Sequence, residues 1–170
     1  MMLKINIRWS DIDANRHLAN SAYVNFMSYA RVVEMKKAGV TQEILEKHNL
    51  GPIVFYEKIF YFKEVLPEQP VYIDLKLKGL SEDNKFFQFE QNMYDKNGQN
   101  MAGYEMLGSW IDMKKRKLAA LPDELAELFN HIKRSEDFKV LTKEDTRKFG
   151  MLPKHINPKE IQENLEEAYQ

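Results

Sequence analysis

The chain has 170 residues, of which 44% are hydrophobic and 12% aromatic, so we expect one folded domain with an ordinary core rather than a disordered segment. Its 25 Lys and Arg residues balance 26 Asp and Glu residues, which argues against a nucleic acid or a membrane surface as partner. The absence of cysteine excludes disulfides, cysteine nucleophiles and thiolate metal sites. No signal peptide, transit peptide or membrane-spanning run is recognisable, so a cytoplasmic location is expected.

Residues 2–9 alternate apolar and polar side chains, which predicts a half-buried first strand. The polar run that follows holds four chemically useful side chains at every second position. They are Asp11, Asp13, Asn15 and His17. On an extended backbone, all four would project to one side.

A long helix is predicted from about residue 20 to Lys37, with Asn20 or Ser21 as its N-cap and Gly39 just beyond its end. The start of this helix points into the polar run. Its unpaired backbone amides and the positive end of its dipole favour negative charge there. A carboxylate, an imidazole and a helix N-terminus can together activate a nucleophile and stabilise an oxyanion.

A short helix is predicted from Thr41 to Leu50, and four strands joined by turns should follow it. The strands are expected at residues 53–66, 71–80, 85–95 and 99–113. Between the last two, the run Asp95 to Gly98 is a strong hairpin signal. This order predicts an α+β domain in which an antiparallel sheet packs one face against a central helix.

The rest of the chain is rich in charge. It contains a basic run at residues 114–117, a helix start near Asp123 and one further helix predicted from Pro158 to Tyr169. We therefore divide the chain into a domain at residues 1–130 and a charged C-terminal extension at 131–170, which would pack on the domain or on a partner.

The polar run and the helix start carry a resemblance to a known family. The pattern R-x-x-D-x-D-x-x-x-H-x-x-N-x-x-Y resembles the hotdog-fold acyl thioesterases, specifically the 4-hydroxybenzoyl-CoA thioesterase-like group. In this chain its positions are Arg8, Asp11, Asp13, His17, Asn20 and Tyr23. The shorter piece D-x-N-x-H is similar to a motif of plant acyl-ACP thioesterases. The resemblance covers roughly residues 3–130.

The resemblance implies a single hotdog domain, in which a five-stranded antiparallel sheet wraps a long central helix, followed here by a helical C-terminal tail. It also implies hydrolysis of acyl-CoA or acyl-ACP to a free carboxylic acid without a cofactor or a metal. Hotdog proteins usually assemble with the pocket at the seam between subunits, so a homodimer or homotetramer is expected.

By the same resemblance, Asp13 takes the catalytic carboxylate position, as general base or nucleophile, with Asn15 and His17 as partners. A glutamate after the helix joins the plant site, and Glu64 matches it best by local pattern, with Glu57 as competitor. The remaining site residues belong to the helix start, whose amides would hold the substrate carbonyl oxygen. They are Asn20, Ser21 and Tyr23. The chain lacks the glycine that many bacterial members carry between the aspartate and the histidine.

Several other interpretations stay open. Asp13 is also typical of a turn aspartate held by local amides, and His17 of a structural histidine. The basic run at 114–117 fits a solvated connection, or a contact with the phosphates of coenzyme A or with an acidic carrier protein. The aromatic residues Phe55, Phe60 and Phe62 fit the core or a subunit interface better than an acyl pocket, although a pocket needs a similar lining. The whole chain could be a non-catalytic acyl-binding protein or a hotdog hydratase or dehydratase.

Overall fold

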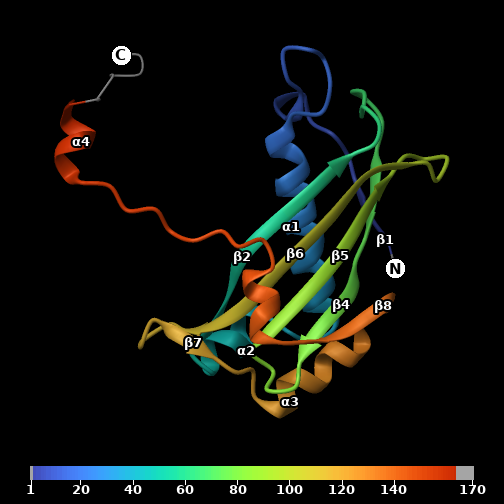
Figure 1. Cartoon of the computed structure of the whole chain (residues 1–170). Helices are drawn as coiled ribbons and strands as arrows, with labels where there is room; N and C mark the ends of the chain where they lie inside the picture. Colours follow the sequence, from blue (N-terminus) through green and yellow to red (C-terminus); the bar gives the residue numbers. More distant parts are fainter. Residues whose placement is uncertain (1, 164–170) are drawn as a thin grey trace.

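The computed structural model describes residues 2–163, in which one long helix lies against one face of a sheet (Figure 1). The helices are α1 (Asn20–Lys37), α2 (Gln42–Lys47), α3 (Asp123–Ala126) and α4 (Pro158–Glu163), with 3-10 turns η1 (Trp9–Asp11), η2 (Glu127–His131) and η3 (Lys143–Arg147). The strands are β1 (Met2–Ile5), β2 (Leu50–Tyr61), β3 (Val71–Asp74), β4 (Lys76–Ser81), β5 (Phe86–Tyr94), β6 (Asn100–Asp112), β7 (Lys117–Ala119) and β8 (Arg134–Leu141).

The sheet is antiparallel except at one edge. β5 is central and pairs with β3, β4 and β6, while β1 continues the sheet beyond β3. β8 runs parallel to β4. At the opposite edge, β2 pairs with β6, and among the described strands it has no other neighbour. A twelve-residue strand with one unpaired edge therefore borders the molecule.

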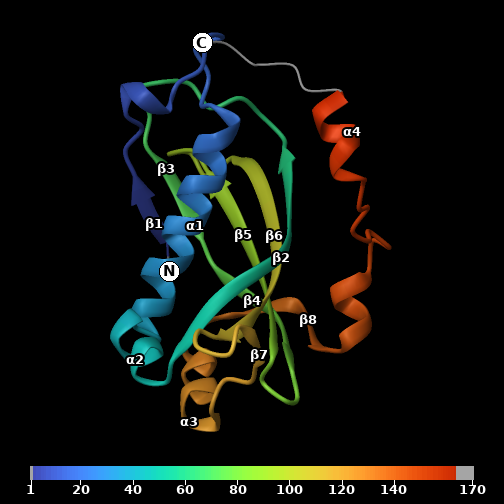
Figure 2. The same cartoon turned by 90° about the vertical axis from the view of Figure 1, so that its left-hand side faces the viewer.

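The hydrophobic core lies between α1 and the sheet. Phe26, Met27 and Ala30 of α1 are at most 5% exposed and belong to the same buried cluster as Phe89 and Trp110 of the sheet. This confirms the amphipathic helix, which ends as predicted with Lys36 and Lys37 before Gly39 at φ 100°. The segment after β8 runs along the other face of the sheet, the one that α1 does not cover (Figure 2).

The register of β2 shifts between Val54 and Tyr56, where Phe55 is an extra residue opposite β6. Gly108 lies at this bulge. A Cβ built on Gly108 would stand 2.5 Å from the carbonyl oxygen of Ile53, so only glycine permits this approach of the two backbones. A glycine inside a strand is typical of such a bulge with close backbone approach.

The five expected strands are all present, with four differences. The first strand ends at Ile5, and Trp9, predicted to face the core, is 93% exposed. The third predicted strand is interrupted at Leu75 and forms β3 and β4. Gly51 and Pro52, which fall between the predicted short helix and the predicted second strand, lie inside β2. β7 and β8 were not predicted.

β8 lies in the segment that the sequence places outside the domain. It pairs with β4, and Lys78 of β4 forms ion pairs of 2.9 Å with Asp137 of β8 and 2.5 Å with Glu105 of β6. After β8 the chain still contacts the sheet at Phe149, whose ring meets that of Tyr56 in β2 edge-on with centroids 4.9 Å apart, and α4 then lies away from the sheet in the described part (Figure 1). The predicted helix to Tyr169 is described only as far as Glu163.

Candidate active site

The polar run before α1 forms a tight loop and not the extended backbone on which all four side chains would project to one side. Asp13 donates its amide hydrogen to the carbonyl oxygen of His17 at 2.9 Å, and Ile12 and Leu18 form a β-bridge. Arg16 turns the chain with φ 63°. This turn brings Asp13, Asn15 and His17 to one cavity, whereas Asp11, the fourth residue of the alternation, does not line it.

The carboxylate of Asp13 holds the loop together. Its Oδ1 accepts hydrogen bonds from the amides of Asn15 at 2.8 Å and of His17 at 3.2 Å. The turn role that the sequence left open is therefore present. The second carboxylate oxygen takes part in neither bond, and the side chain still lines the cavity. One oxygen can thus fix the carboxylate while the other meets a substrate.

Asp11 has a different environment. It is 7% exposed, and it accepts hydrogen bonds from the Arg8 amide at 2.8 Å and from the guanidinium at 3.1 and 3.2 Å. These side-chain bonds hold the pKa of the Asp11 carboxyl below its usual value. Asp11 therefore supports the start of the loop and does not line the cavity.

Glu64 reaches the loop from just beyond the end of β2. The amides of Phe62 and Lys63 both donate to the carbonyl oxygen of Met101, at 2.9 and 3.1 Å. The carbonyl oxygen of Val65 accepts from the amide of Leu18 at 2.9 Å, so the segment is fixed on both sides. Oε2 of Glu64 lies 2.9 Å from Nε2 of His17, and the side chains of Glu64 and His17 are 52% and 41% exposed.

The bond between Glu64 and His17 determines how the imidazole can react. A carboxylate oxygen accepts a hydrogen bond, so the contact keeps a proton on Nε2 of His17. The neutral ring then carries its lone pair on Nδ1, where it can accept a proton from water. The pair supplies an oriented imidazole next to the Asp13 loop.

The N-terminus of α1 lies at the same place. The N-cap is Ala19, whose side chain cannot cap, so the prediction of a capping Asn20 or Ser21 was wrong. In the part of the chain that the structure describes, the first-turn amides of Asn20 and Ser21 have no acceptor. The Asn20 side chain lines the cavity and the Ser21 side chain does not. These free donors are suited to an oxyanion.

Tyr23 is a buried residue of the cavity lining. It is 3% exposed, and its ring meets the Tyr61 ring edge-on with centroids 5.0 Å apart. Burial raises the pKa of its hydroxyl, although a hydrogen bond to the backbone of Val65 acts in the opposite direction. Tyr23 is therefore a neutral wall of the cavity at physiological pH.

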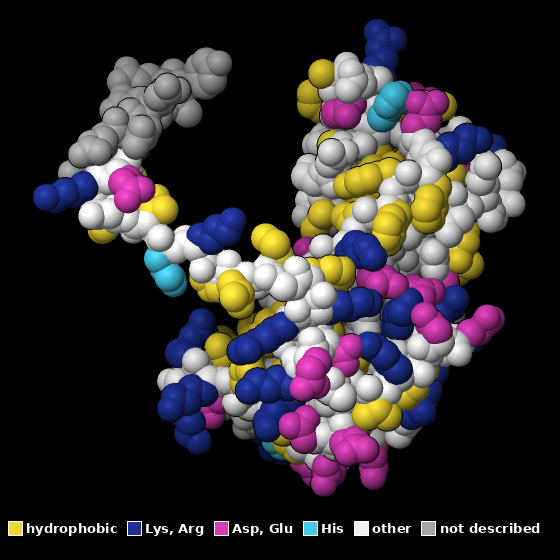
Figure 3. Space-filling view, in the orientation of Figure 1, with side chains coloured by type: hydrophobic (Ala, Val, Ile, Leu, Met, Phe, Trp, Pro, Cys, Tyr) yellow, Lys and Arg dark blue, Asp and Glu magenta, His cyan; other side chains and the backbone are white. Residues whose placement is uncertain are grey.

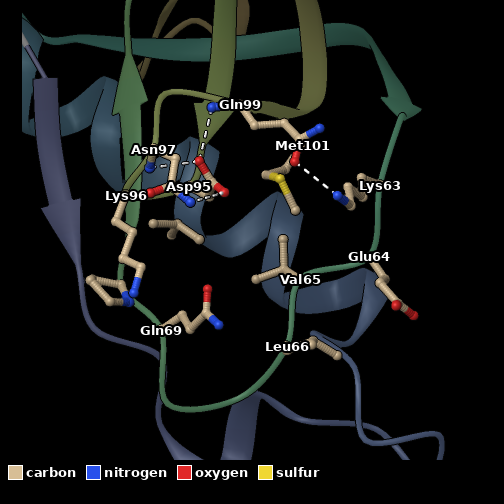
Figure 4. Close-up of a pocket in the computed structure, with 12 residues that line it drawn as sticks. Lys63, Glu64, Val65, Leu66, Gln69, Asp95, Lys96, Asn97, Gln99 and Met101 are labelled. Carbon is tan, nitrogen blue, oxygen red and sulfur yellow. Dashed lines mark hydrogen bonds between the residues drawn. The ribbon is translucent and has the colours of Figure 1, made fainter.

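The resulting cavity is open and has a volume of about 420 Å³. Besides the predicted residues, its lining includes Tyr61, Phe62 and Lys63, which sequence reasoning missed although they immediately precede Glu64. A second cavity of about 290 Å³ adjoins the segment at residues 63–65. Figure 4 shows Val65 pointing into this second cavity and Glu64 away from it.

The competing glutamate, Glu57, lies elsewhere on β2. It accepts a hydrogen bond from the hydroxyl of Tyr104 and lies 3.8 Å from the guanidinium of Arg31 on α1. It does not line the cavity around His17.

The aromatic residues Phe55, Phe60 and Phe62 are 39%, 42% and 60% exposed, so they are not part of the core. Phe62 lines the cavity around His17, as an acyl pocket would require, and a subunit interface stays a prediction for Phe55 and Phe60.

A sheet wrapped on one long helix, with ionisable side chains gathered at the helix start, defines this chain as an α+β hotdog domain. A family model, the thioesterase-like superfamily, matches residues 7–129. The chain belongs to this superfamily. No curated protein matches its sequence. Within residues 2–163, no group of three or more His, Asp or Glu side chains is placed to hold a metal ion. None of the helices in those residues is long and apolar enough to cross a membrane.

Solved structures share the fold at low sequence identity. The probable thioesterase YbaW of Escherichia coli is 24% identical with a TM-score of 0.68, over 79% of this chain and 99% of that one. DHNA-CoA thioesterase of Staphylococcus aureus is 14% identical with a TM-score of 0.70, over 76% and 88%. A hypothetical protein of Staphylococcus aureus in complex with CoA is 14% identical with a TM-score of 0.72, over 90% and 94%.

Proposed function

We propose that this protein hydrolyses acyl-CoA thioesters to a free carboxylic acid and coenzyme A. The observation that carries the proposal is the meeting of Asp13, the His17–Glu64 pair and the unpaired amides of α1 at one cavity. The superfamily supports thioester chemistry. Two structural neighbours, one named for a CoA thioester and one bound to CoA, support the choice of CoA over acyl carrier protein.

In the proposed reaction, water attacks the carbonyl carbon of the thioester. The carbonyl oxygen then becomes an oxyanion next to the first-turn amides of α1. Asp13 takes the proton of the attacking water, and Asn15 positions that water. When the tetrahedral intermediate collapses, the carbon–sulfur bond breaks and the thiolate of coenzyme A leaves. Thiolate is a good leaving group, so no strong general acid is needed. His17, oriented by Glu64, shares the proton transfer.

Asp13 could also attack the carbonyl carbon itself and form an anhydride that water then opens. The two routes differ in the origin of one oxygen. In a single turnover in ¹⁸O-labelled water, base catalysis puts the label into the acid product. Direct attack, with the anhydride opened at its Asp13 carbonyl, leaves the first product unlabelled and labels the Asp13 carboxylate.

The test of the proposed function is thiol release from acyl-CoAs of several chain lengths and from acyl-ACP. Wild type should release thiol, and Asp13→Asn should lose about 10²- to 10⁴-fold in rate, the usual contribution of a positioned base. No release by wild type from any substrate would leave the alternative of an acyl-binding protein. Equal rates in the two proteins would keep the hydrolase and remove Asp13 from its mechanism. Turnover of an enoyl-CoA by hydration instead would favour the hydratase reading.

We further propose a homodimer, built by pairing β2 with its own copy. β2 is long, has an unpaired edge and exposes apolar side chains at Val54, Phe55, Phe60 and Tyr61. A twofold axis is the commonest way for soluble proteins to cover such an edge. A molar mass in solution equal to one chain would refute this assembly, and a mass of four chains would point to the tetramer. The domain division at residue 130 and the cytoplasmic location stay predictions.

A further inference from the structure

The basic turn between β6 and β7 has no role in the site described above. We define it as Lys114, Lys115, Arg116 and Lys117, all of which are exposed. Figure 3 shows Lys and Arg side chains gathered over the end of the molecule where Figure 1 places β7.

This turn is held in a fixed conformation. Oδ1 of Asp112 accepts hydrogen bonds from the amides of Lys114 at 2.9 Å and Lys115 at 2.8 Å, and from the side-chain amide of Asn49 at 2.8 Å. Asp112 is therefore occupied largely by backbone and amide donors, and its contact with the Lys115 ammonium is 3.8 Å. The four cations therefore project from a hydrogen-bonded turn whose base is held by the carboxylate of Asp112.

Within one chain, the basic turn is too far from the site to meet the substrate. The site is anchored to the start of β6, because Lys63 donates to Met101, and the turn follows its end at Asp112. Residues 101 to 112 are 11 steps of strand, or roughly 36 Å at about 3.3 Å each. The pantetheine arm between the sulfur and the diphosphate of coenzyme A is comparable to about five extended residues, ~17 Å.

Two copies joined through β2 bring the two regions together. A twofold axis pairs an edge strand antiparallel to itself, so the start of β2 in one copy lies beside the end of β2 in the other. In each copy Asp112 is opposite Leu50, the first residue of β2. The basic turn then lies two strand spacings, roughly 10 Å, to the side of Tyr61 in the second copy. Glu64 follows Tyr61 by three residues.

We propose that the basic turn of one copy binds the phosphate groups of the acyl-CoA whose thioester lies at the Asp13–His17 site of the second copy. The inference rests on the proposed function and on the β2 dimer. It makes each site depend on residues from both chains. It also assigns the basic run, which the sequence left open, to substrate binding in trans.

The first experiment compares three thioesters of one acyl group, carried by CoA, by pantetheine and by ACP. The test variant is Lys114→Gln/Lys115→Gln/Arg116→Gln, and the control Lys4→Gln/Lys133→Gln/Lys159→Gln removes the same charge from exposed positions elsewhere. The test variant should raise KM for acyl-CoA roughly tenfold, since each exposed ion pair contributes little alone. Acyl-pantetheine, which lacks phosphate, should be hydrolysed as by wild type, which also shows that the fold is intact.

The second experiment tests whether the contact is in trans. Mixed dimers of Asp13→Asn with the test variant are purified through two different affinity tags. Their one intact Asp13 site faces the unchanged turn of the Asp13→Asn chain. A wild-type KM for acyl-CoA in these dimers is the expected result. A KM that stays raised would show that each turn serves its own chain, and it would overturn the proposal.

Other outcomes of these experiments also test whether the basic turn binds the phosphate groups. An unchanged KM for acyl-CoA in the test variant refutes the inference and leaves the hydrolase intact. A defect confined to acyl-ACP would assign the turn to the carrier protein and also refute it. If wild type hydrolyses nothing, the proposed function fails, and calorimetry with CoA decides the inference. Roughly tenfold weaker binding by the test variant than by the control then supports the phosphate contact, and equal binding refutes it.

Discussion

The pair formed by Glu64 and His17 leads to a prediction about which of the site carboxylates performs the chemistry. Glu64→Gln removes the charge of Glu64 but keeps an oxygen that can accept the hydrogen bond from Nε2 of His17. If Glu64 acts only by orienting the imidazole, this variant should lose little activity. If Glu64 is itself the base, the loss should resemble that of Asp13→Asn.

The structure sets the size of the expected effect. Once His17 has accepted a proton on Nδ1 and carries a charge, it attracts the Glu64 carboxylate, 2.9 Å away between Nε2 and Oε2, by about 1.4 kcal/mol in bulk water. The side chains are 41% and 52% exposed, so screening and side-chain entropy reduce this further. Exposed pairs contribute about 0.2–1 kcal/mol in measured cycles. Since 1.4 kcal/mol is a factor of ten, Glu64→Gln should lower kcat no more than about fivefold.

The assay is thiol release from one acyl-CoA under saturating conditions, measured for Glu64→Gln, His17→Asn and the double variant. The double variant should be no slower than His17→Asn alone, because Glu64 acts through the ring. The free energy of unfolding by urea should fall by less than about 1 kcal/mol in Glu64→Gln.

Two results would refute this reasoning. A loss of more than a hundredfold in Glu64→Gln would make Glu64 the base and would displace Asp13 from that role. Additive losses in the double variant would show that the two side chains act independently, in spite of their contact.

Three further predictions concern the framework of the site. Asp13→Ala should be about 1 kcal/mol less stable than Asp13→Asn, because only Asn keeps an oxygen for the two loop amides; equal urea midpoints would contradict the loop role. Gly108→Ala should lose about 2–3 kcal/mol, since its Cβ would meet a backbone carbonyl oxygen of β2 at 2.5 Å. The control Gly98→Ala, with nothing within 4 Å but a φ of 79°, should lose only about 1 kcal/mol, and a smaller loss at Gly108 would disprove the close approach. The pKa of Asp11 is lowered by Arg8 in the folded state, so the stability from this pair is present above the ordinary Asp value of about 3.9 and is lost as the pH falls through the lowered pKa. The stability difference between wild type and Arg8→Gln should therefore be constant near neutrality and shrink below about pH 4, and a constant difference down to pH 2 would contradict it.

The sequence predicted the fold well where local patterns and tertiary packing agree. The helix ending at Lys36 and Lys37 combines an apolar face, a cationic last turn and a glycine that takes a positive φ, so three independent signals coincide. The hairpin at Asp95 is similar, because the Asp95 carboxylate accepts from the amides of Asn97 and Gln99 at 2.8 Å. Such signals lie within a few residues of the structure that they specify.

β8 could not be predicted because its stability comes from distant residues. Its buried positions are Ser135 and Leu141, with Phe138 half-buried between them, which does not follow the alternation of an antiparallel strand. Lys78, more than fifty residues earlier, supplies the charge that Asp137 meets. A charged sequence of this kind indicates an exposed segment until the partner strand is known.

The sequence proposes a set of candidate site residues but not their geometry. Asp13, Asn15 and His17 could be chosen by pattern, whereas the turn at Arg16 that gathers them requires a positive φ at a non-glycine residue. The preference for Glu64 over Glu57 came from local pattern. Its physical reason is that β2 ends at Tyr61, and the next segment is held toward Leu18, which only the folded chain reveals.

The bulge in β2 has a consequence for how this strand can change. Because Phe55 is an extra residue, the positions before it are shifted by one relative to those after it, so Leu50 and Tyr61 face the same side of the sheet. Deleting Phe55 would leave Val54 opposite Gly108 and Tyr56 opposite Leu107, which is the pairing of a regular strand, so Leu50 would keep its place in the core, where it is 8% exposed. A second deletion would have no extra residue to absorb it, so it would turn one end of the strand over and present the opposite side chains to a second copy. The bulge therefore lets β2 lose one residue without changing which side chains its unpaired edge offers.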